Sequence, residues 1–517
     1  MASATVDERT PVLIGGGQFT YRGDPLQAPS PLGLLRTAAE RAIADAGLSA
    51  EQARGLDTVA VVAFTIDAPG NSMAIPRLRN PPASLARTLG ANPATSIYTE
   101  TGGNSPQHLI NLLAERIAAG EVDFALAAGC EFLGSLQKKL RAGVSTADHE
   151  DEVPGAPEPE RVGDPRPGVT PYERAHGLQF PVNTYPLFEN ALRARDGRSL
   201  ADHQRRLGEL FAPFTQVAAG NPHAWFPVER SAEELVMVAE RNRMVSYPYP
   251  KYLNAIMEVD QSAAVILCSV AKARALGVPE DRWVFLHGCA DASDLWFPLE
   301  RQNYWSSPAM RLTGAKALDM AGLTVGDMDL FDLYSCFPVA VEIGAESIGL
   351  ALNDPRGFTV TGGLPYMGGP GNNYVMHSVA EMTARLRARP GAVGMVTGNG
   401  WYLTKQSVGV YSTRPVEGPW RREDPRTLQR EIDALPHPEV TETPSGPAVI
   451  ETYTVVHDRG GYRMGIVVGR DEADRRFVAV TPDNEATLRD LESREGVGRR
   501  GAVAPHPDGR RNLFTPD

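Results

Sequence analysis

Cysteines and histidines are the first residues to consider for chemistry, because thiolates and imidazoles serve as nucleophiles, bases and metal ligands. The four cysteines, Cys130, Cys268, Cys289 and Cys336, are far apart, and none forms a CxxC pair. The ten histidines are scattered, and no HExxH motif occurs. The sequence therefore predicts no metal site and no disulfide framework.

Two glycine-rich segments are the other features that could support chemistry. Gly102-Gly103-Asn104-Ser105-Pro106 and Gly368-Gly369-Pro370-Gly371-Asn372-Asn373 each precede a predicted helix. The N-terminus of a helix offers free N–H groups and partial positive charge, which suit a carbonyl oxygen or an anion. We expect the two turns to meet and to mark the site.

Sequence motifs for phosphate binding are absent. No GK[ST] loop occurs, and Gly15-Gly16-Gly17, which ends a predicted strand at 12–14, does not continue as GxGxxG. The net charge of −12 argues against binding of nucleic acid. The first residues lack the basic and apolar regions of a secretory signal, and no apolar stretch approaches about 18 residues. We therefore expect a cytoplasmic protein without membrane contact.

An internal repeat determines the expected fold. Ser30-Pro31 and Ser307-Pro308 start helices of similar pattern. Each glycine-rich turn then leads through a helix into an apolar strand that ends in glycine, with nearly equal spacing from Gly103 to Gly129 and from Gly371 to Gly398. This pattern predicts a duplicated β-α-β unit whose two copies pack about a pseudo-twofold axis.

Further segments surround this duplicated core. Residues 154–171 hold six prolines and are expected to form a surface excursion, while helices are predicted at 183–195, 199–219 and 231–240 as an inserted cap. After a proline-rich linker, three strands, a helix at 485–493 and a strand near Gly501 predict a small antiparallel barrel of the OB kind. The expected domains are a first half at 10–145, a cap at 146–240, a second half at 241–413 that begins with strand 263–269, a linker at 414–446 and a barrel at 447–510.

Five motifs carry a resemblance to a known family. They are GEVDFALAAGCE ending at Glu131, Asn221-Pro222-His223-Ala224, SYPYPKYLNAIMEVDQSAAVILCS at 246–269, Tyr334-Ser335-Cys336-Phe337, and the run from Gly362 to Pro370. In this order and spacing, residues 10–413 resemble the thiolase superfamily. They are most similar to the branch of sterol carrier protein-type thiolases, often named acetyl-CoA acetyltransferases, here with an additional C-terminal β-barrel domain.

The resemblance implies an α/β protein of two βαβαβαββ halves. These pack as a five-layered α/β/α/β/α fold with a helical cap insertion, followed here by the antiparallel OB-like barrel. It also implies a CoA or acyl-CoA ligand under the cap, no other cofactor, and commonly a homodimer. Because the extra barrel could block that dimer, a monomer is the alternative.

The catalytic groups of thiolases do not carry over to this sequence. The position of the nucleophilic cysteine falls on Gly103, and the first residue of the family's Asn-Glu-Ala-Phe or His-Asp-Cys-Phe motif falls on Tyr334. The Gly-His-Pro histidine falls on Gly369, and the second cysteine falls within Thr397-Gly398-Asn399-Gly400. The resemblance therefore implies a protein without ordinary thiolase activity.

Tyr334 has two interpretations. Thiolase-like retro-aldolases carry a Tyr-Asp-x-Phe motif, use its tyrosine as acid or base on β-hydroxyacyl-CoA, and work with an OB-type partner chain. Here the tyrosine is kept, and Ser335 replaces the aspartate. Tyr334 is thus the candidate catalytic residue of a C–C lyase, or a phenol that fills vacated space.

The candidate binding residues lie in the glycine-rich turns, at the cap exit and after the last strand of the repeat. They are Gly103, Asn104, Ser105, Tyr247, Tyr249, Gly368, Gly369, Gly371 and Asn399. The glycines alternatively serve tight turns, and Asn104 and Ser105 alternatively cap a helix. The expected function is an acyl-CoA-binding or CoA-binding protein of lipid or sterol metabolism, with the retro-aldol lyase as the alternative.

Overall fold

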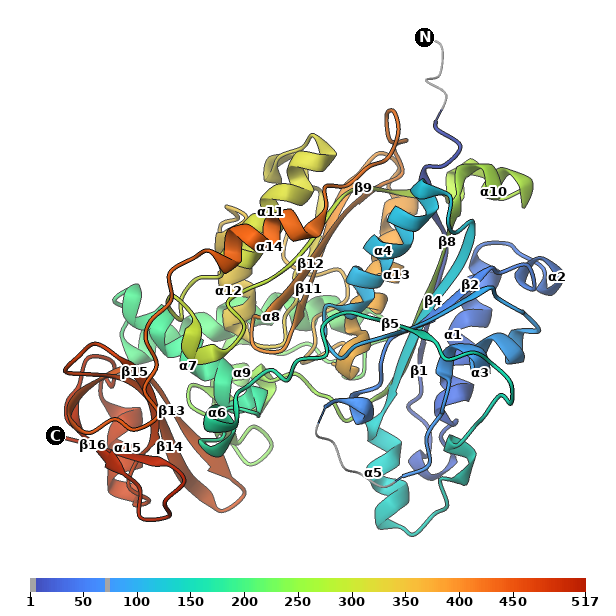
Figure 1. Cartoon of the computed structure of the whole chain (residues 1–517). Coiled ribbons are helices and arrows are strands. Elements are labelled where there is room, and N and C mark those ends of the chain that lie inside the picture. The colour runs from blue at the N-terminus through green and yellow to red at the C-terminus, as the bar shows by residue number, and fades with distance from the viewer. Residues whose placement is uncertain (1–5, 70–74) are drawn as a thin grey trace.

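The computed structural model describes residues 6–69 and 75–517, and its largest element is a ten-stranded mixed sheet built twice from one plan (Figure 1). The strand order is β1-β8-β4-β2-β3 in the first unit and β9-β12-β11-β10 in the second. In both units the first two pairings are antiparallel and the following ones are parallel. The duplication predicted from the sequence is therefore present in the topology.

The strands of the first unit are β1 (Pro11–Thr20), β2 (Thr58–Val61), β3 (Thr95–Thr99), β4 (Phe124–Phe132) and β8 (Asp260–Ser269). Those of the second unit are β9 (Val284–Ser293), β10 (Leu330–Asp332), β11 (Val393–Gly400) and β12 (Lys405–Ser412). A short pairing of β1 with β9 joins the two units.

Helices complete five layers, which confirms the expected α/β/α/β/α fold. The central helices α4 (Ser105–Ala119) and α13 (Tyr374–Ala388) lie between the two sheet units. Outside the first unit lies α1 (Pro31–Asp45) with α3 (Pro81–Leu89), and outside the second lies α11 (Pro308–Ala321). The strands are buried on both faces because helices cover both faces of each unit.

Strand β8, which the sequence placed at the start of the second half, lies between β1 and β4 of the first unit. It therefore occupies the same place in its unit as β12 in the second, and the strands of the second unit begin with β9. An apolar pattern indicates that a strand is buried but does not indicate which strands it pairs with. The sequence alone therefore could not assign β8 to a unit.

The glycine triplet 15–17 does not end β1, as expected from the sequence, but lies inside the strand. A Cβ on Gly15 would lie 2.3 Å from Ala42 O, and one on Gly17 would lie 2.2 Å from Ala38 O. The triplet therefore allows the backbone of α1 to approach β1 closely, which is a packing role.

The cap is confirmed as α7 (Pro181–Arg195), α8 (Leu200–Gly220) and a short α9 (Ala232–Val236). The proline-rich excursion contains a short strand, β5 (Glu160–Val162), which pairs with β3 at the edge of the sheet. The linker likewise contains a helix, α14 (Pro425–Asp433), which packs against β9 and α11.

The remaining helices are short and connect these elements. They are α2 (Ala50–Ala53), α5 (Leu133–Arg141), α6 (Pro171–Ala175), α10 (Val270–Ala275) and α12 (Pro338–Ser347). Within the described part of the chain, none of the helices has both the length and the apolar character needed to cross a membrane.

The C-terminal domain is a closed five-stranded barrel with the OB order of strands. Each strand pairs with the next in the cycle β13-β14-β15-β17-β16-β13, and α15 lies between the third and fourth strands in the chain. The elements are β13 (Gly446–Asp458), β14 (Gly461–Asp471), β15 (Arg476–Val480), α15 (Glu485–Ser493), β16 (Arg500–Pro505) and β17 (Asn512–Pro516).

The barrel is attached to the cap and to the second unit (Figure 1). Two short strands after the cap, β6 (Met244–Ser246) and β7 (Tyr249–Pro250), extend its sheet next to β13. Buried Arg193 of α7 forms a bidentate pair with Glu495, and fully buried Arg476 donates to Leu299 O at 2.9 Å. These contacts make the barrel a packed part of the molecule.

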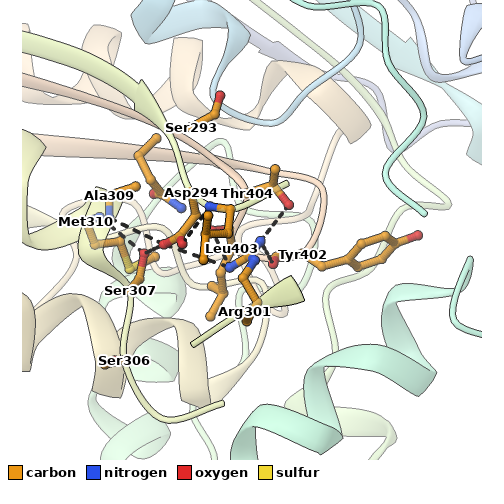
Figure 2. Close-up of polar contacts among 12 residues, drawn as sticks. Ser293, Asp294, Arg301, Ser306, Ser307, Ala309, Met310, Tyr402, Leu403 and Thr404 are labelled. Carbon is orange, nitrogen blue, oxygen red and sulfur yellow. Dashed lines mark hydrogen bonds and ion pairs between the residues drawn. The ribbon is translucent and has the colours of Figure 1, made fainter. Parts of the chain in front are cut away.

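A buried ion pair between Arg301 and Asp294 stabilises the turn between β11 and β12 (Figure 2). The guanidinium of Arg301 donates to Tyr402 O, Leu403 O and Thr404 Oγ1, while Asp294 Oδ2 accepts from the Ser307 hydroxyl at 2.6 Å. Leu403 has a positive φ of 56°, a conformation that costs free energy in a residue other than glycine. The arginine therefore stabilises a strained turn that directly follows Asn399.

Candidate functional site

Helices α4 and α13 begin at one place between the sheet units, each with an asparagine at the N-cap position, Asn104 and Asn373. Each asparagine lies against a glycine in a strand of the other unit. A Cβ on Gly129 would lie 2.0 Å from Asn373 Oδ1, and one on Gly398 would lie 2.9 Å from Asn104 Cα. The two turns therefore meet, and each strand passes the opposite helix only because it has no side chain there.

This geometry shifts the alignment of the repeat by one residue. The number of residues from Asn104 to Gly129 equals that from Asn373 to Gly398, so Gly103 corresponds to Asn372 and not to Gly371. The Asn372 amide joins the two turns, because its Oδ1 accepts from Gly102 N at 3.0 Å and its Nδ2 donates to Ala63 O at 2.8 Å.

Gly103, the position at which the resemblance implies the thiolase nucleophile, lies against Tyr334. A Cβ on Gly103 would lie 2.2 Å from the Tyr334 hydroxyl oxygen and 2.5 Å from Asn399 O. The phenol of Tyr334 thus occupies the space into which a side chain at position 103 would extend.

The surroundings of Tyr334 keep its phenol neutral. The ring is buried and meets the Tyr374 ring edge to face, with centroids 5.7 Å apart. Burial raises the pKa of Tyr334 well above its usual value near 10, and Cys336 adds to this increase. The helix N-termini therefore do not produce a phenolate here, so Tyr334 can donate a proton but is not a base at neutral pH.

The second glycine-rich turn is shaped by close contacts with side chains. Gly371 has a φ of +48°, and a Cβ there would lie 2.0 Å from Thr65 Oγ1. Gly368 has a φ of +109°, and a Cβ there would lie 2.3 Å from Gln261 Oε1. Gly369 has more space, with Ile256 O at 3.2 Å from its Cβ position.

Asn104 and Ser105 begin α4, but their side chains do not cap it. Asn104 Nδ2 donates to Ser407 Oγ at 3.0 Å, and the Ser105 hydroxyl donates to Glu100 O at 2.8 Å. Asn399, the last candidate in this region, donates from Nδ2 to Tyr185 OH at 2.9 Å. The Asn104 amide thus has a partner in the other unit and the Ser105 hydroxyl has a backbone carbonyl five residues earlier, so neither forms the helix cap that was the alternative interpretation.

Tyr247 and Tyr249 belong to other surroundings. Tyr247 stacks on Tyr453 with ring centroids 6.2 Å apart and packs with the core of the barrel. Tyr249 is fully buried, donates to Glu189 Oε2 at 2.5 Å, and lies against the Phe337 ring. The structure thus places Tyr247 between cap and barrel, and Tyr249 between the cap and the second unit.

The other groups with catalytic potential in this region are buried and uncharged or weakly acidic. Burial raises the pKa of Cys336 to about 12 and lowers that of His377 to about 3, and His377 Nδ1 lies 3.0 Å from Gln18 Oε1. All four cysteines are buried. Neither a thiolate nor an imidazolium is therefore present beside Tyr334 at neutral pH.

Glu131 is a residue whose role the sequence did not reveal. Its carboxylate is fully buried beside Gly371 and accepts from both the N and the Oγ1 of Thr65 at 2.6 Å. Burial raises its pKa to about 7. The available signal was an acidic residue near the end of the apolar strand that follows α4.

Open space lies under the cap. A pocket of about 630 Å³ separates α8 from the segment 352–359 of the second unit and is bordered by Arg206, Phe214 and Val217. Its inner wall approaches the Tyr334 segment, because a Cβ on Gly363 would lie 2.6 Å from the Phe214 ring and 2.7 Å from Ser335 Oγ. The volume is typical of small-molecule sites.

Taken together, the duplicated five-layered core, the cap and the barrel define a thiolase-like protein with an additional C-terminal domain. Residues 427–510 match the family described as the additional C-terminal domain of thiolase-like protein type 1. The crystal structure of a monomeric SCP2-thiolase-like protein type 1 from Mycobacterium smegmatis is 39% identical, covers 99% of both chains and has a TM-score of 0.84. The chain belongs to this family, the SCP2-thiolase-like proteins of type 1.

Two curated relatives are more distant. Acetyl-CoA acetyltransferases of Methanothermobacter thermautotrophicus and Methanocaldococcus jannaschii are 23% and 22% identical over 285 and 273 residues. These matches cover 55% and 53% of this chain, and 66% and 62% of the relatives' lengths. A solved chain described as Ltp2-ChsH2(DUF35) aldolase shares the fold at 19% identity, covers 78% of this chain and 98% of its own, and has a TM-score of 0.57.

Gly103→Ala should lower the free energy of unfolding by about 1–3 kcal/mol, because its methyl group collides with Tyr334. Tyr334→Ala should recover part of this loss in the double variant, which a double-mutant cycle from urea unfolding measures. Gly344→Ala is the control, because a Cβ there meets no atom within 4 Å. If the losses of unfolding free energy in the two single variants simply add in the double variant, the contact between Gly103 and Tyr334 does not cause the loss in Gly103→Ala.

Proposed function

We propose that this protein binds CoA or an acyl-CoA of lipid or sterol metabolism and catalyses neither thiolysis nor condensation of acyl-CoA. The observation that carries the proposal is the Tyr334 hydroxyl, which fills the place of a side chain at position 103. Without a thiolate at this position, an acyl group has no acceptor at this helix N-terminus.

The pocket under the cap is the proposed binding site. The side chain of Arg206 is 41% exposed at its border and offers a positive charge for a phosphate. Phe214 and Phe358 provide apolar surface for the pantetheine chain. Phe214 of the pocket wall also contacts Gly363, and a Cβ on Gly363 would lie 2.7 Å from Ser335 Oγ, so these two residues separate the pocket from the residue that follows Tyr334.

Val217→Trp should weaken CoA binding at least about tenfold, because the indole fills a pocket that Val217 borders. Isothermal titration calorimetry with CoA and acetyl-CoA measures the effect. Val228→Trp is the matched control on the cap, since Val228 is already 47% exposed. Equal affinity of the wild type and Val217→Trp would contradict the proposed site. Turnover of acetoacetyl-CoA near the common enzyme rate of about 10 per second would contradict the proposed absence of thiolase activity.

A second candidate function is retro-aldol cleavage of a β-hydroxyacyl-CoA, because Tyr334 retains a hydroxyl group at the junction of the two turns. A neutral phenol is suited to protonate the enolate that forms when the C–C bond breaks. Glu131, which lies beside Gly371 of the second turn and whose pKa is raised to about 7, is the carboxyl group that we propose to accept the substrate proton.

If this second reaction occurs, Tyr334→Phe should lower its rate by about 100-fold or more, because the proton donor is lost. The assay follows release of aldehyde or ketone from a panel of β-hydroxyacyl-CoA thioesters. Release at the same rate from both proteins would show that Tyr334 only fills space, and no release from the wild type would leave binding as the function.

We further propose that the protein is a monomer, as the related protein from M. smegmatis is described to be. Its own strand β5 pairs with β3, so β3 is not free to pair with a second chain. Light scattering should give a mass close to 55.8 kDa at all concentrations tested. A mass near twice this value would refute the proposal.

A further inference from the structure

A second pocket, of about 330 Å³, lies beside the first turns of α4 and is not used by the proposed function. It is bordered by Ser105 and His108 of α4, by Asp291 of β9 and by Lys405 of β12. A hydroxyl, an imidazole, a carboxylate and an ammonium group therefore border one open space. These are the group types that a hydrolytic serine site requires.

His108 and Asp291 form an oriented pair. His108 Nδ1 lies 3.2 Å from Asp291 Oδ1, and the His108 side chain is 26% exposed. With Nδ1–H donating to the carboxylate, Nε2 remains free to accept a proton. This is the arrangement of a general base whose tautomer is fixed by an acid.

The surroundings of Asp291 keep it ionised. Arg422 Nη1 donates to its Oδ2 at 2.7 Å, Asn111 Nδ2 donates at 3.1 Å, and the Ser407 hydroxyl donates to Oδ1 at 2.5 Å. Burial by itself would raise the pKa of Asp291, but His108 and Arg422 together lower it to about 2. The carboxylate is thus charged throughout the neutral range and can stabilise a protonated His108.

Ser105 is the serine of α4 that borders the same pocket as His108. It is the first residue of α4, where the helix dipole favours negative charge, and His108 follows it by one turn on the same side of the helix. Side chains of a helix lean toward its N-terminus, so His108 lies over the turn that contains Ser105. The Ser105 hydroxyl donates to Glu100 O at 2.8 Å in the resting structure, and the proposed reaction requires it to turn about χ1 toward His108 Nε2.

We propose that Ser105, His108 and Asp291 form a serine hydrolase site for small carboxylic esters or thioesters, independent of Tyr334. Ser105 Oγ adds to the acyl carbon while its proton passes to His108 Nε2. The C–O or C–S bond then breaks, and the departing oxygen or sulfur takes that proton. Water repeats the two steps and releases the carboxylic acid and free Ser105.

Lys405 provides the positive charge for the oxyanion that forms during this addition. Its Nζ donates to Thr101 O at 2.8 Å and to Asp164 O at 2.7 Å, which uses two of its three N–H groups. The third N–H remains for a substrate oxygen. Burial lowers the pKa of Lys405 to about 8, so the ammonium group is still mostly charged at pH 7.

The test is labelling of the intact protein with a fluorophosphonate probe, followed by peptide mass spectrometry, and hydrolysis of 4-nitrophenyl acetate and acetyl-CoA. We expect the label on Ser105, and hydrolysis that falls about 100-fold or more in Ser105→Ala and in His108→Gln. Ser145→Ala, in an exposed loop, is the control and should retain both.

A second variant keeps the test independent of folding defects. In Ser105→Cys, iodoacetamide should alkylate the new thiol, and His108→Gln in the same chain should slow this reaction about tenfold or more, because the imidazole no longer promotes the thiolate. Circular dichroism confirms that each variant is folded. No label on Ser105, a label that His108→Gln does not affect, or hydrolysis that persists in Ser105→Ala would each overturn the proposal.

Discussion

The mutual approach of two helix N-termini and two strands is the constraint on which the rest of the structure depends. Gly129 faces Asn373 and Gly398 faces Asn104, and the space at each contact is too small for a methyl group. The central helices can therefore lie between the sheet units only if both strands carry glycine at these points. The backbone of the turn buried before α4 needs polar partners, and the Asn372 amide supplies one to Gly102 N across the pseudo-twofold axis. Close packing of the layers and satisfaction of the backbone are thus achieved by the same few residues.

Among these residues only Gly398 lies in a segment, 397–400, where the resemblance places a thiolase catalytic group. The packing of the junction therefore does not require the side chains of thiolase chemistry. The space beside Gly103, where a side chain would extend, would be a void in a densely packed centre if no other group occupied it, and voids of this kind are destabilising. The phenol of Tyr334 fills the space, and its neutral form needs no counter-charge. The same burial that makes the phenol a good filler raises its pKa and so favours the neutral form.

Local pattern predicted the elements well, whereas partners distant in the chain decided most of the details of the site. The cap helices and the barrel strands could be predicted from apolar periodicity, because apolar residues recur at the buried positions of each element. Asn104 looks like a cap from its neighbours in the chain, yet its amide binds Ser407 in the other unit. Tyr247 follows the cap as a pocket residue would, yet its partner Tyr453 belongs to the barrel. The base for Ser105 was not recognisable either, since Asp291, which orients His108, lies on β9.

One chain of hydrogen bonds connects the junction of the glycine-rich turns with the Ser105 pocket. Asn104 donates to Ser407, Ser407 donates to Asp291, and Asp291 pairs with His108. Asn104 and His108 belong to the first unit of the repeat, whereas Ser407 and Asp291 belong to the second, so the His108–Asp291 pair exists only where the units are packed together. The asparagine that shapes the junction therefore also holds the acid of the neighbouring pocket. A network that spans both units stays ordered only while the junction does, which couples the geometry of the Ser105 pocket to the packing of α4 against α13.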